Sequence, residues 1–189
     1  MSYVDPLDQQ ALEVQISELL VATADSYDHE LDRRITDVLL LLRKQLRMDV
    51  VFVSEFIGRE RVFRFVDGSV PRGPQTGDVA PLEESYCQRV VEGRLPELVN
   101  DTAPYTASGD LPHLKFLVGT HLSTPVVLPD GRIYGTVCCF SESSRPDLQQ
   151  SALACLRQCA RLVARKVDSA PSEPEWQATE PAPFPEITK

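Results

Sequence analysis

The chain has 189 residues, 42% of them hydrophobic and 25% charged, which is the composition of an ordinary globular protein with one sizeable core. Its formal net charge of −9 argues against nucleic acid or an anionic membrane as the main partner, because both attract basic proteins. No apolar run approaches the roughly 20 residues of a spanning helix, no signal peptide is expected, and the five cysteines have no disulfide-framework spacing. We therefore expect a cytoplasmic protein with reduced thiols.

Two helices are predicted at the start of the chain. Leu7–Ala24 carries apolar residues at helical spacing, and Asp28 is a candidate N-cap for a second helix from His29 to about Met48. The second helix is apolar around much of its girth, which predicts burial on more than one side. The first has a narrower apolar stripe, which predicts contact with a copy of itself and hence a homodimer.

The middle of the chain reads as short strands and helices separated by Gly- and Pro-rich loops. The predicted elements are strands at Asp49–Phe56 and Val62–Val66 joined by a turn at Gly58–Arg61, a loop over Asp67–Pro81, a short helix from Pro81 to about Gly93, a strand at Leu98–Val99 and an irregular, partly helical segment over Thr102–Val118.

The stretch from Gly119 to Phe140 predicts a β-hairpin. Two apolar runs, Thr120–Leu128 and Arg132–Phe140, flank Asp130-Gly131, and a glycine supplies the positive φ that a tight hairpin turn needs. Both runs are apolar nearly throughout, which favours a position in the middle of a sheet that is covered on both faces. Gly135 leaves room for a close approach to the backbone of the second strand.

The end of the chain is predicted to hold one long helix and a tail. The helix begins at Pro146-Asp147 and runs to about Val167, whereas Ser169–Lys189 contains five prolines and four glutamates and is expected to be disordered. The order of elements predicts an α+β fold whose antiparallel sheet carries the terminal helices on one face and the middle segments on the other.

This order, with the segments PLEESYCQRVVEGRLPELVNDT and PDGRIYGTVCCFS, resembles the GAF domain of bacterial sensory proteins from about Leu31 to Val167. The run from Asn100 to Phe140 further looks like the bilin-pocket half of phytochrome GAF domains, where an Asp-x-Pro element precedes a histidine-led helix and a hairpin. The matching residues are Asp101, Pro104, His113 with Leu114, and Gly131 with Gly135. The resemblance implies an N-terminal dimerisation and signalling helix at 1–28, a GAF domain with a ligand pocket at 29–167, and a tail at 168–189.

Three more specific features of known family members are not matched here: the bilin-attaching cysteine, the cyclic-nucleotide pattern and the reductase cysteines. Phytochromes that attach bilin within the domain use a cysteine immediately before the histidine, where this chain has Pro112, and its first cysteine is Cys87. The Asn-Lys…Phe…Asp-Glu pattern of cyclic-nucleotide-binding members is not found, and the cysteines do not match those of members that reduce free methionine sulfoxide. The sequence therefore leaves the ligand and any cofactor unknown.

Candidate ligand contacts come from the segments that are expected to cover the hairpin. A core built for stability alone would avoid such polar groups, because each one buried without a partner costs about 1–3 kcal/mol. If the segment before the hairpin folds over the sheet, His113 and His121 converge and, with a cysteine, can hold a metal or haem; satisfied polar groups are the alternative. The candidates are Tyr86, Cys87, Asp101, His113, Phe116, His121, Ser123 and Cys138.

Several of these residues also have ordinary explanations. Cys138 and Cys139 point to opposite faces of a strand, so one of them faces the pocket. Asp101 is either a ligand contact or the cap of an Asx turn. Cys87 is the best placed for reactivity, although no Lys or His beside it in sequence lowers its pKa. The remaining pair, Cys155 and Cys159, stands at helical spacing and fits packing, a thiol switch or a dimer contact.

The expected function is a non-enzymatic sensory domain that binds a small molecule and signals through its terminal helices to a partner protein. No catalytic residue and no metal ligand is assigned. Two alternatives remain open: a thiol-dependent reductase acting on a small oxidised substrate, and a pure dimerisation scaffold whose pocket is filled by side chains.

Overall fold

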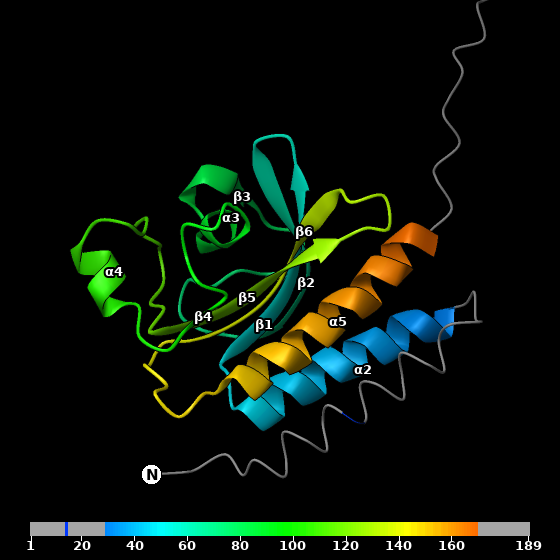
Figure 1. Cartoon of the computed structure of the whole chain (residues 1–189), viewed down its shortest axis with the longest axis horizontal. Helices are drawn as coiled ribbons and strands as arrows, with labels where there is room; N and C mark the ends of the chain where they lie inside the picture. The colour runs from blue at the N-terminus through cyan, green and yellow to red at the C-terminus, as the bar shows by residue number, and fades with distance from the viewer. Residues whose placement is uncertain (1–13, 15–28, 170–189) are drawn as a thin grey trace, which may run out of the picture.

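An antiparallel sheet of six strands separates two layers in the structure, a computed structural model that describes residue 14 and residues 29–169 (Figure 1). The strands lie in the order β3-β2-β1-β6-β5-β4. Their bounds are β1 Val50–Ile57, β2 Glu60–Gly68, β3 Val79–Pro81, β4 Leu98–Val99, β5 Thr120–Val127 and β6 Ile133–Ser141. The predicted α+β fold, with its antiparallel sheet and terminal helices, is confirmed.

One face of the sheet is covered by helices α2 (His29–Leu46) and α5 (Gln150–Ser169), which lie side by side (Figure 1). Leu42 of α2 and Leu156 of α5 are fully buried with the sheet residue Leu122 in the larger core cluster. Each buried side chain of this kind stabilises the fold by about 1.5–3 kcal/mol. This core fixes the sheet against the two long helices.

The opposite face is covered by short elements. They are the 3₁₀ turn η1 (Leu82–Glu84), α3 (Tyr86–Val91), α4 (Ala103–Ala107) and the segment from 108 to 119. Ser85 caps α3 by accepting a hydrogen bond from the N–H of Gln88 at 3.1 Å. The aromatic side chains of Phe52, Phe63 and Phe140 form the core beneath these elements.

The hairpin forms where the sequence predicts it, in the middle of the sheet. Gly131 has a φ of +85°, as the predicted turn requires. A Cβ atom at Gly135 would lie 1.9 Å from the carbonyl oxygen of Ser54 on the neighbouring strand. The close approach predicted at Gly135 is therefore made by β1, and it allows β1 and β6 to pair.

Three predicted boundaries were wrong. The predicted turn at Gly58–Arg61 contains only Gly58 and Arg59, because pairing with β1 extends β2 in both directions, to Glu60 and Gly68. Part of the predicted loop is β3, which pairs with the outer edge of β2. The third helix begins after Ser85 rather than at Pro81, because η1 precedes it.

The last helix also begins later than predicted, at Gln150 rather than at Pro146-Asp147. Arg145 holds the preceding turn in place by donating hydrogen bonds to the carbonyls of Leu46 and Arg47 at 3.1 and 2.9 Å. Except for residue 14, the predicted first helix at Leu7–Ala24 lies outside the described residues, as does Asp28, the predicted cap of the second helix. Ser169, the first residue of the predicted tail, is the last residue of α5, and the rest of the tail lies outside the described residues.

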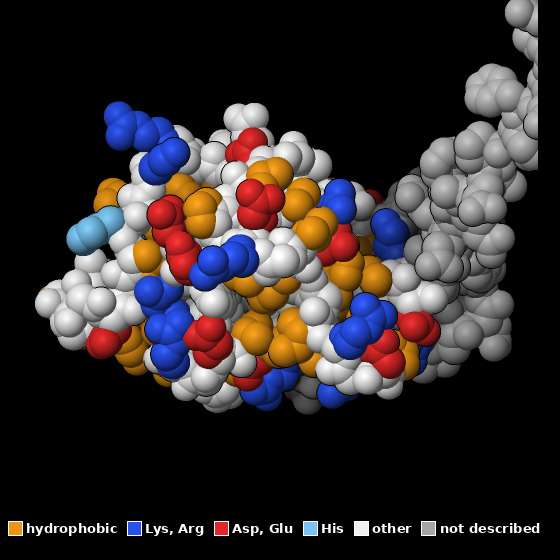
Figure 2. All heavy atoms as spheres, turned by 90° about the horizontal axis from the view of Figure 1, so that it is seen from above, with side chains coloured by type: hydrophobic (Ala, Val, Ile, Leu, Met, Phe, Trp, Pro, Cys, Tyr) orange, Lys and Arg blue, Asp and Glu red, His pale blue; other side chains and the backbone are white. Residues whose placement is uncertain are grey.

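Over the part of the chain that the structure describes, no helix combines the length and apolar character needed to cross a membrane. Figure 2 shows one face of the molecule, on which basic and acidic side chains are interspersed with hydrophobic ones. This face therefore presents no broad area of a single charge.

Candidate functional site

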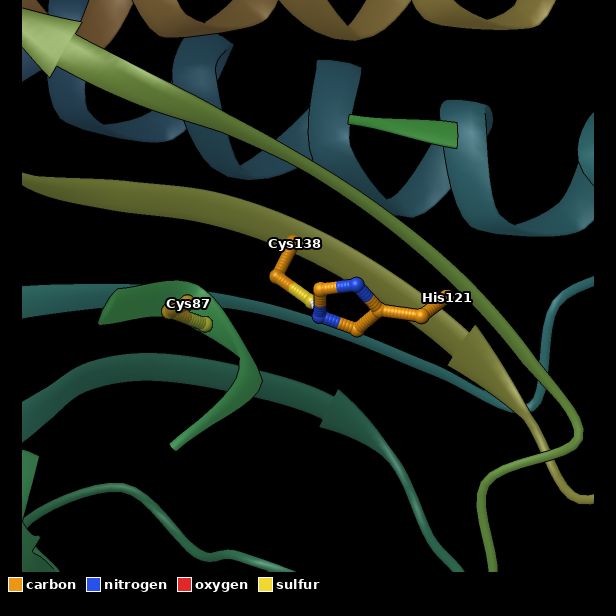
Figure 3. Close-up of side chains that lie close together, drawn as sticks. All are labelled: Cys87, His121 and Cys138. Carbon is orange, nitrogen blue, oxygen red and sulfur yellow. Dashed lines mark hydrogen bonds between the residues drawn. The ribbon is translucent and has the colours of Figure 1, made fainter. Parts of the chain in front are cut away.

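Three buried side chains from three different elements meet on the face opposite the long helices (Figure 3). Cys87 comes from α3, His121 from β5 and Cys138 from β6. One sulfur or ring-nitrogen atom of each lies within 4.8 Å of the other two, and the Nε2 atom of His121 is 3.3 Å from the Sγ atom of Cys138. We call these three residues the Cys-His cluster.

Strand pairing and helix capping explain this convergence. His121 pairs with Phe140 and Ser123 with Cys138, so His121 and Cys138 are diagonal neighbours on one face of the sheet. The cap at Ser85 starts α3 immediately before Cys87, which points from the first turn toward the sheet. None of these pairings can be seen as a local motif in the sequence.

A buried arginine, which sequence reasoning placed in a turn, lies beside the cluster. Arg61 is 6% exposed, and its guanidinium Nη1 lies 3.7 Å from the Sγ atom of Cys87. The guanidinium carbon lies 4.7 Å from the centre of the Phe63 ring and 6.0 Å from that of Phe52, distances at which a cation is attracted to an aromatic face. The sequence did contain a signal for the burial of Arg61. It stands two residues before Phe63 and therefore lies on the same side of β2.

The two thiols of the cluster differ in acidity because their pKa values are shifted in opposite directions. Hydrogen bonding to Cys138 lowers the pKa of Cys87 well below the usual cysteine value despite burial, and His121 and the positive charge of Arg61 lower it further. Burial raises the pKa of Cys138 well above that value, and the neighbouring Cys87 raises it further. Cys87 is thus the more acidic thiol of the pair.

The space beside the cluster is small. A cavity of about 20 Å³ is bounded by the cluster, Arg61 and mostly apolar side chains from the sheet and the covering segment. Pockets for drug-sized ligands measure about 300–1,000 Å³, so this conformation admits only an ion or a molecule the size of water. Besides the cluster and Arg61, the lining residues are Phe52, Tyr86, Leu114, Phe116, Val118 and Phe140.

Aromatic contacts hold the walls of this cavity. Phe116 stacks on Phe140 with ring centres 5.2 Å apart, and Tyr86 meets the His121 ring edge to face at 5.4 Å.

Five of the eight candidate residues line the cavity: Tyr86, Cys87, Phe116, His121 and Cys138.

The other three candidates do not line this cavity. His113 is exposed and does not line the cavity, whereas His121 is buried beside it, so the two histidines do not meet there. Asp101 borders a separate, open cavity of about 520 Å³ and accepts a hydrogen bond from the N–H of Ala103 at 3.0 Å, which is the Asx-turn alternative. Ser123 is buried beside Cys138, but its hydroxyl has no hydrogen-bond partner within the described structure.

The remaining cysteines belong to the helix-covered core. Cys139 faces α2 and α5, opposite to Cys138 as predicted, and burial raises its pKa. Cys155 and Cys159 of α5 are buried in the same core. Of the five cysteines, only Cys87 and Cys138 therefore lie on the face of the sheet opposite the long helices.

Comparison with known proteins identifies the family. The sequence model of the GAF domain matches residues 30–167. This chain belongs to the GAF domain family. Among curated protein sequences, none matches it.

Several solved structures share the fold at low sequence identity. The GAF domain of an Acinetobacter phosphoenolpyruvate-protein phosphotransferase has a TM-score of 0.58 and 13% identity, covering 88% of this chain and 96% of that one. Free methionine-R-sulfoxide reductase from Neisseria meningitidis has a TM-score of 0.62 and 16% identity, covering 85% and 89%. The phycocyanobilin-bound GAF domain of a cyanobacterial phytochrome has a TM-score of 0.56 and 14% identity, covering 85% and 93%.

Proposed function

We propose that this GAF domain is a non-enzymatic regulatory module, which binds a small ligand at the Cys-His cluster and reports its occupancy to a partner chain through α2 and α5. The observation that carries the proposal is the burial of Cys87, His121 and Cys138 together, beside the buried cation of Arg61. An apolar core of the same size would be more stable, because isolated polar groups and charges are costly to bury. Retention of four such groups at one point favours a binding role.

In this proposal, ligand binding at the Cys-His cluster affects the long helices through the strands that carry the cluster. His121 and Cys138 face the ligand side, while their neighbours in sequence, Leu122 and Cys139, pack in the helix-covered core. A ligand that shifts β5 or β6 by a fraction of an ångström therefore also changes the packing under α5. Terminal helices of the domain then pass the change to a partner protein, or to the second copy in the predicted homodimer.

Amide hydrogen exchange, measured with and without a bound compound, tests this proposal. The full chain is screened by thermal shift with chloride salts of divalent metals, haem, biliverdin and cyclic nucleotides, and exchange is then measured with and without each stabilising compound. We expect a compound that stabilises the protein to change amide exchange in β5, β6 and α5, and Cys138→Ala to lose the response. A stabilising compound that leaves α2 and α5 unchanged contradicts signalling through these helices.

A thiol-dependent reductase is the second candidate, and the acidity of Cys87 beside Cys138 favours it. Reduction of a sulfoxide by this pair would give a sulfide, one water and a Cys87–Cys138 disulfide, which dithiothreitol would reduce again. The small cavity opposes this candidate, because a substrate enters only if the segment with Phe116 moves. Turnover of free methionine sulfoxide with dithiothreitol, abolished in Cys87→Ser, would support it over the binding module.

A further inference from the structure

We propose that Cys87, His121 and Cys138 bind one thiophilic d¹⁰ metal ion, Cu(I) or Zn(II), through two thiolate sulfurs and the Nε2 nitrogen. This inference rests on the proposed function and names the ligand class of its site. In tetrahedral coordination with bonds of about 2.3 Å to sulfur and 2.0 Å to nitrogen, the ligand atoms lie roughly 3.5–3.8 Å apart. The atoms here lie within 4.8 Å of one another, so small side-chain rotations bring all three to bonding distance.

The donor set decides which metals fit. Two sulfurs and one imidazole nitrogen are soft to borderline ligands, which favour copper and zinc over magnesium or calcium. No carboxylate belongs to the cluster. The site is therefore unsuited to hard cations such as Mg²⁺ and Ca²⁺, which take oxygen ligands.

Arg61 adjusts the charge of this site. Its guanidinium, 3.7 Å from the Cys87 sulfur, stabilises the thiolate form that metal binding requires. With both cysteines deprotonated, two thiolates and one guanidinium carry a net charge of −1. A monovalent ion such as Cu(I) neutralises the buried group and needs no ligand beyond the three.

Zn(II) would occupy the same three ligands differently. A divalent ion leaves one excess positive charge, and zinc takes a fourth ligand that the cluster does not supply. The adjoining cavity of about 20 Å³ has room for one water or hydroxide at that position. A fourth, oxygen ligand is therefore expected with Zn(II) and not with Cu(I).

The surroundings of the second ring nitrogen of His121 predict a moderate affinity of the cluster for the metal ion. Its Nε2 atom faces Cys138, while its Nδ1 atom has no hydrogen-bond partner in the described part of the chain. Metal-binding histidines usually donate this second N–H, and loss of such an outer partner weakens binding by about 10–100-fold. We therefore expect an exchangeable ion, as a sensor requires, rather than one that is lost only on unfolding.

Metal titration of the reduced full chain tests the inference. Zn(II) is titrated against a chromophoric chelator and Cu(I) against bicinchoninate under anaerobic conditions, and Co(II) reports thiolate ligation by its charge-transfer absorption. We expect one equivalent per chain and loss of that equivalent in Cys138→Ala. The matched control is Cys139→Ala, the same change at the next residue of the same strand, with the same complete burial and the opposite face.

X-ray absorption of the metal-loaded parent protein keeps the test decisive if a variant fails to fold. Two sulfur neighbours and one light (nitrogen or oxygen) neighbour support the site for Cu(I), and a second light neighbour is expected for Zn(II). Less than one equivalent bound, no sulfur ligand, or equal loss in Cys139→Ala overturns it. Metal binding without altered exchange in α2 and α5 supports the metal site and contradicts the proposed signalling. A different compound that stabilises the protein and alters exchange in α2 and α5, with no metal uptake, supports the signalling and contradicts the metal site.

Discussion

His121 Nε2 lies 3.3 Å from Cys138 Sγ, although the two residues stand on different strands of the hairpin and 17 positions apart in sequence. The contact follows from the register of β5 and β6, which makes the two residues diagonal neighbours on the face away from the long helices. A change of register by one residue would place the two side chains on opposite faces of the sheet. The cluster thus depends on the strand pairing as much as on its own residues.

The two histidines near the hairpin should behave differently. His121→Gln removes the imidazole of the cluster and is expected to abolish stabilisation of the protein by added Zn(II). His113→Ala changes an exposed side chain that does not line the cavity, and should keep the parent's response. Melting temperatures with and without ZnCl₂ measure both effects. An equal loss in both variants would show that the segment with His113 closes over the site.

Phe116 is expected to control access to the two thiols. It is half-buried and stacks on Phe140 at the wall of the cavity, so Phe116→Ala should cost less than the roughly 3–5 kcal/mol of a fully buried Phe→Ala change. The opened cavity should let iodoacetamide alkylate Cys87 faster than in the parent. Leu117→Ala, at an adjacent and 70% exposed side chain, is the control and should change neither property. Peptide mass spectrometry and urea unfolding provide the measurements.

Gly135 should tolerate no side chain. In Gly135→Ala the new Cβ meets the Ser54 carbonyl at 1.9 Å, and separating β1 from β6 should cost about 3 kcal/mol or more in unfolding free energy. Gly131→Ala is the matched change in the turn of the same hairpin. It has open space but a positive φ, so about 1–2 kcal/mol is expected. Equal losses for the two variants would contradict a steric role for Gly135.

Glu97 should make stability depend on acid pH. Partial burial opposes its ionisation, but hydrogen bonds from Arg157 and from Thr124, the latter at 2.5 Å, outweigh this and lower the pKa of Glu97. Because the unfolded chain then binds the proton more readily, this contribution is present above the ordinary glutamate pKa and is lost as the pH falls through the lower folded value.

Glu97→Gln is therefore expected to flatten the decline of stability below about pH 4.3, the ordinary glutamate value. The loss at pH 7 should stay near 1 kcal/mol or less, because the ion pair with Arg157 is partly exposed. Urea unfolding from pH 7 down to pH 3 measures the slope. A slope unchanged from the parent would show that Glu97 is not the group responsible.

The sequence alone determined the elements whose signals are local. The Asp130-Gly131 turn between two apolar runs predicted the hairpin, and helical spacing of leucines predicted α2 and α5, because turn conformation and periodic burial are written in neighbouring residues. Those elements, in order, were enough to indicate the GAF fold. Opposite faces for Cys138 and Cys139 also followed from strand geometry alone.

Only the tertiary structure decided the site. No spacing in the sequence brings Cys87 of α3 to His121 and Cys138, and no local neighbour makes its thiol acidic; the lowering of its pKa comes from Cys138, His121 and Arg61, contributed by three strands. Conversely, His113 looked functional by resemblance but points outward. Long-range strand register and the packing of α3 on the sheet set which side chains meet, and these depend on contacts between residues far apart in the chain.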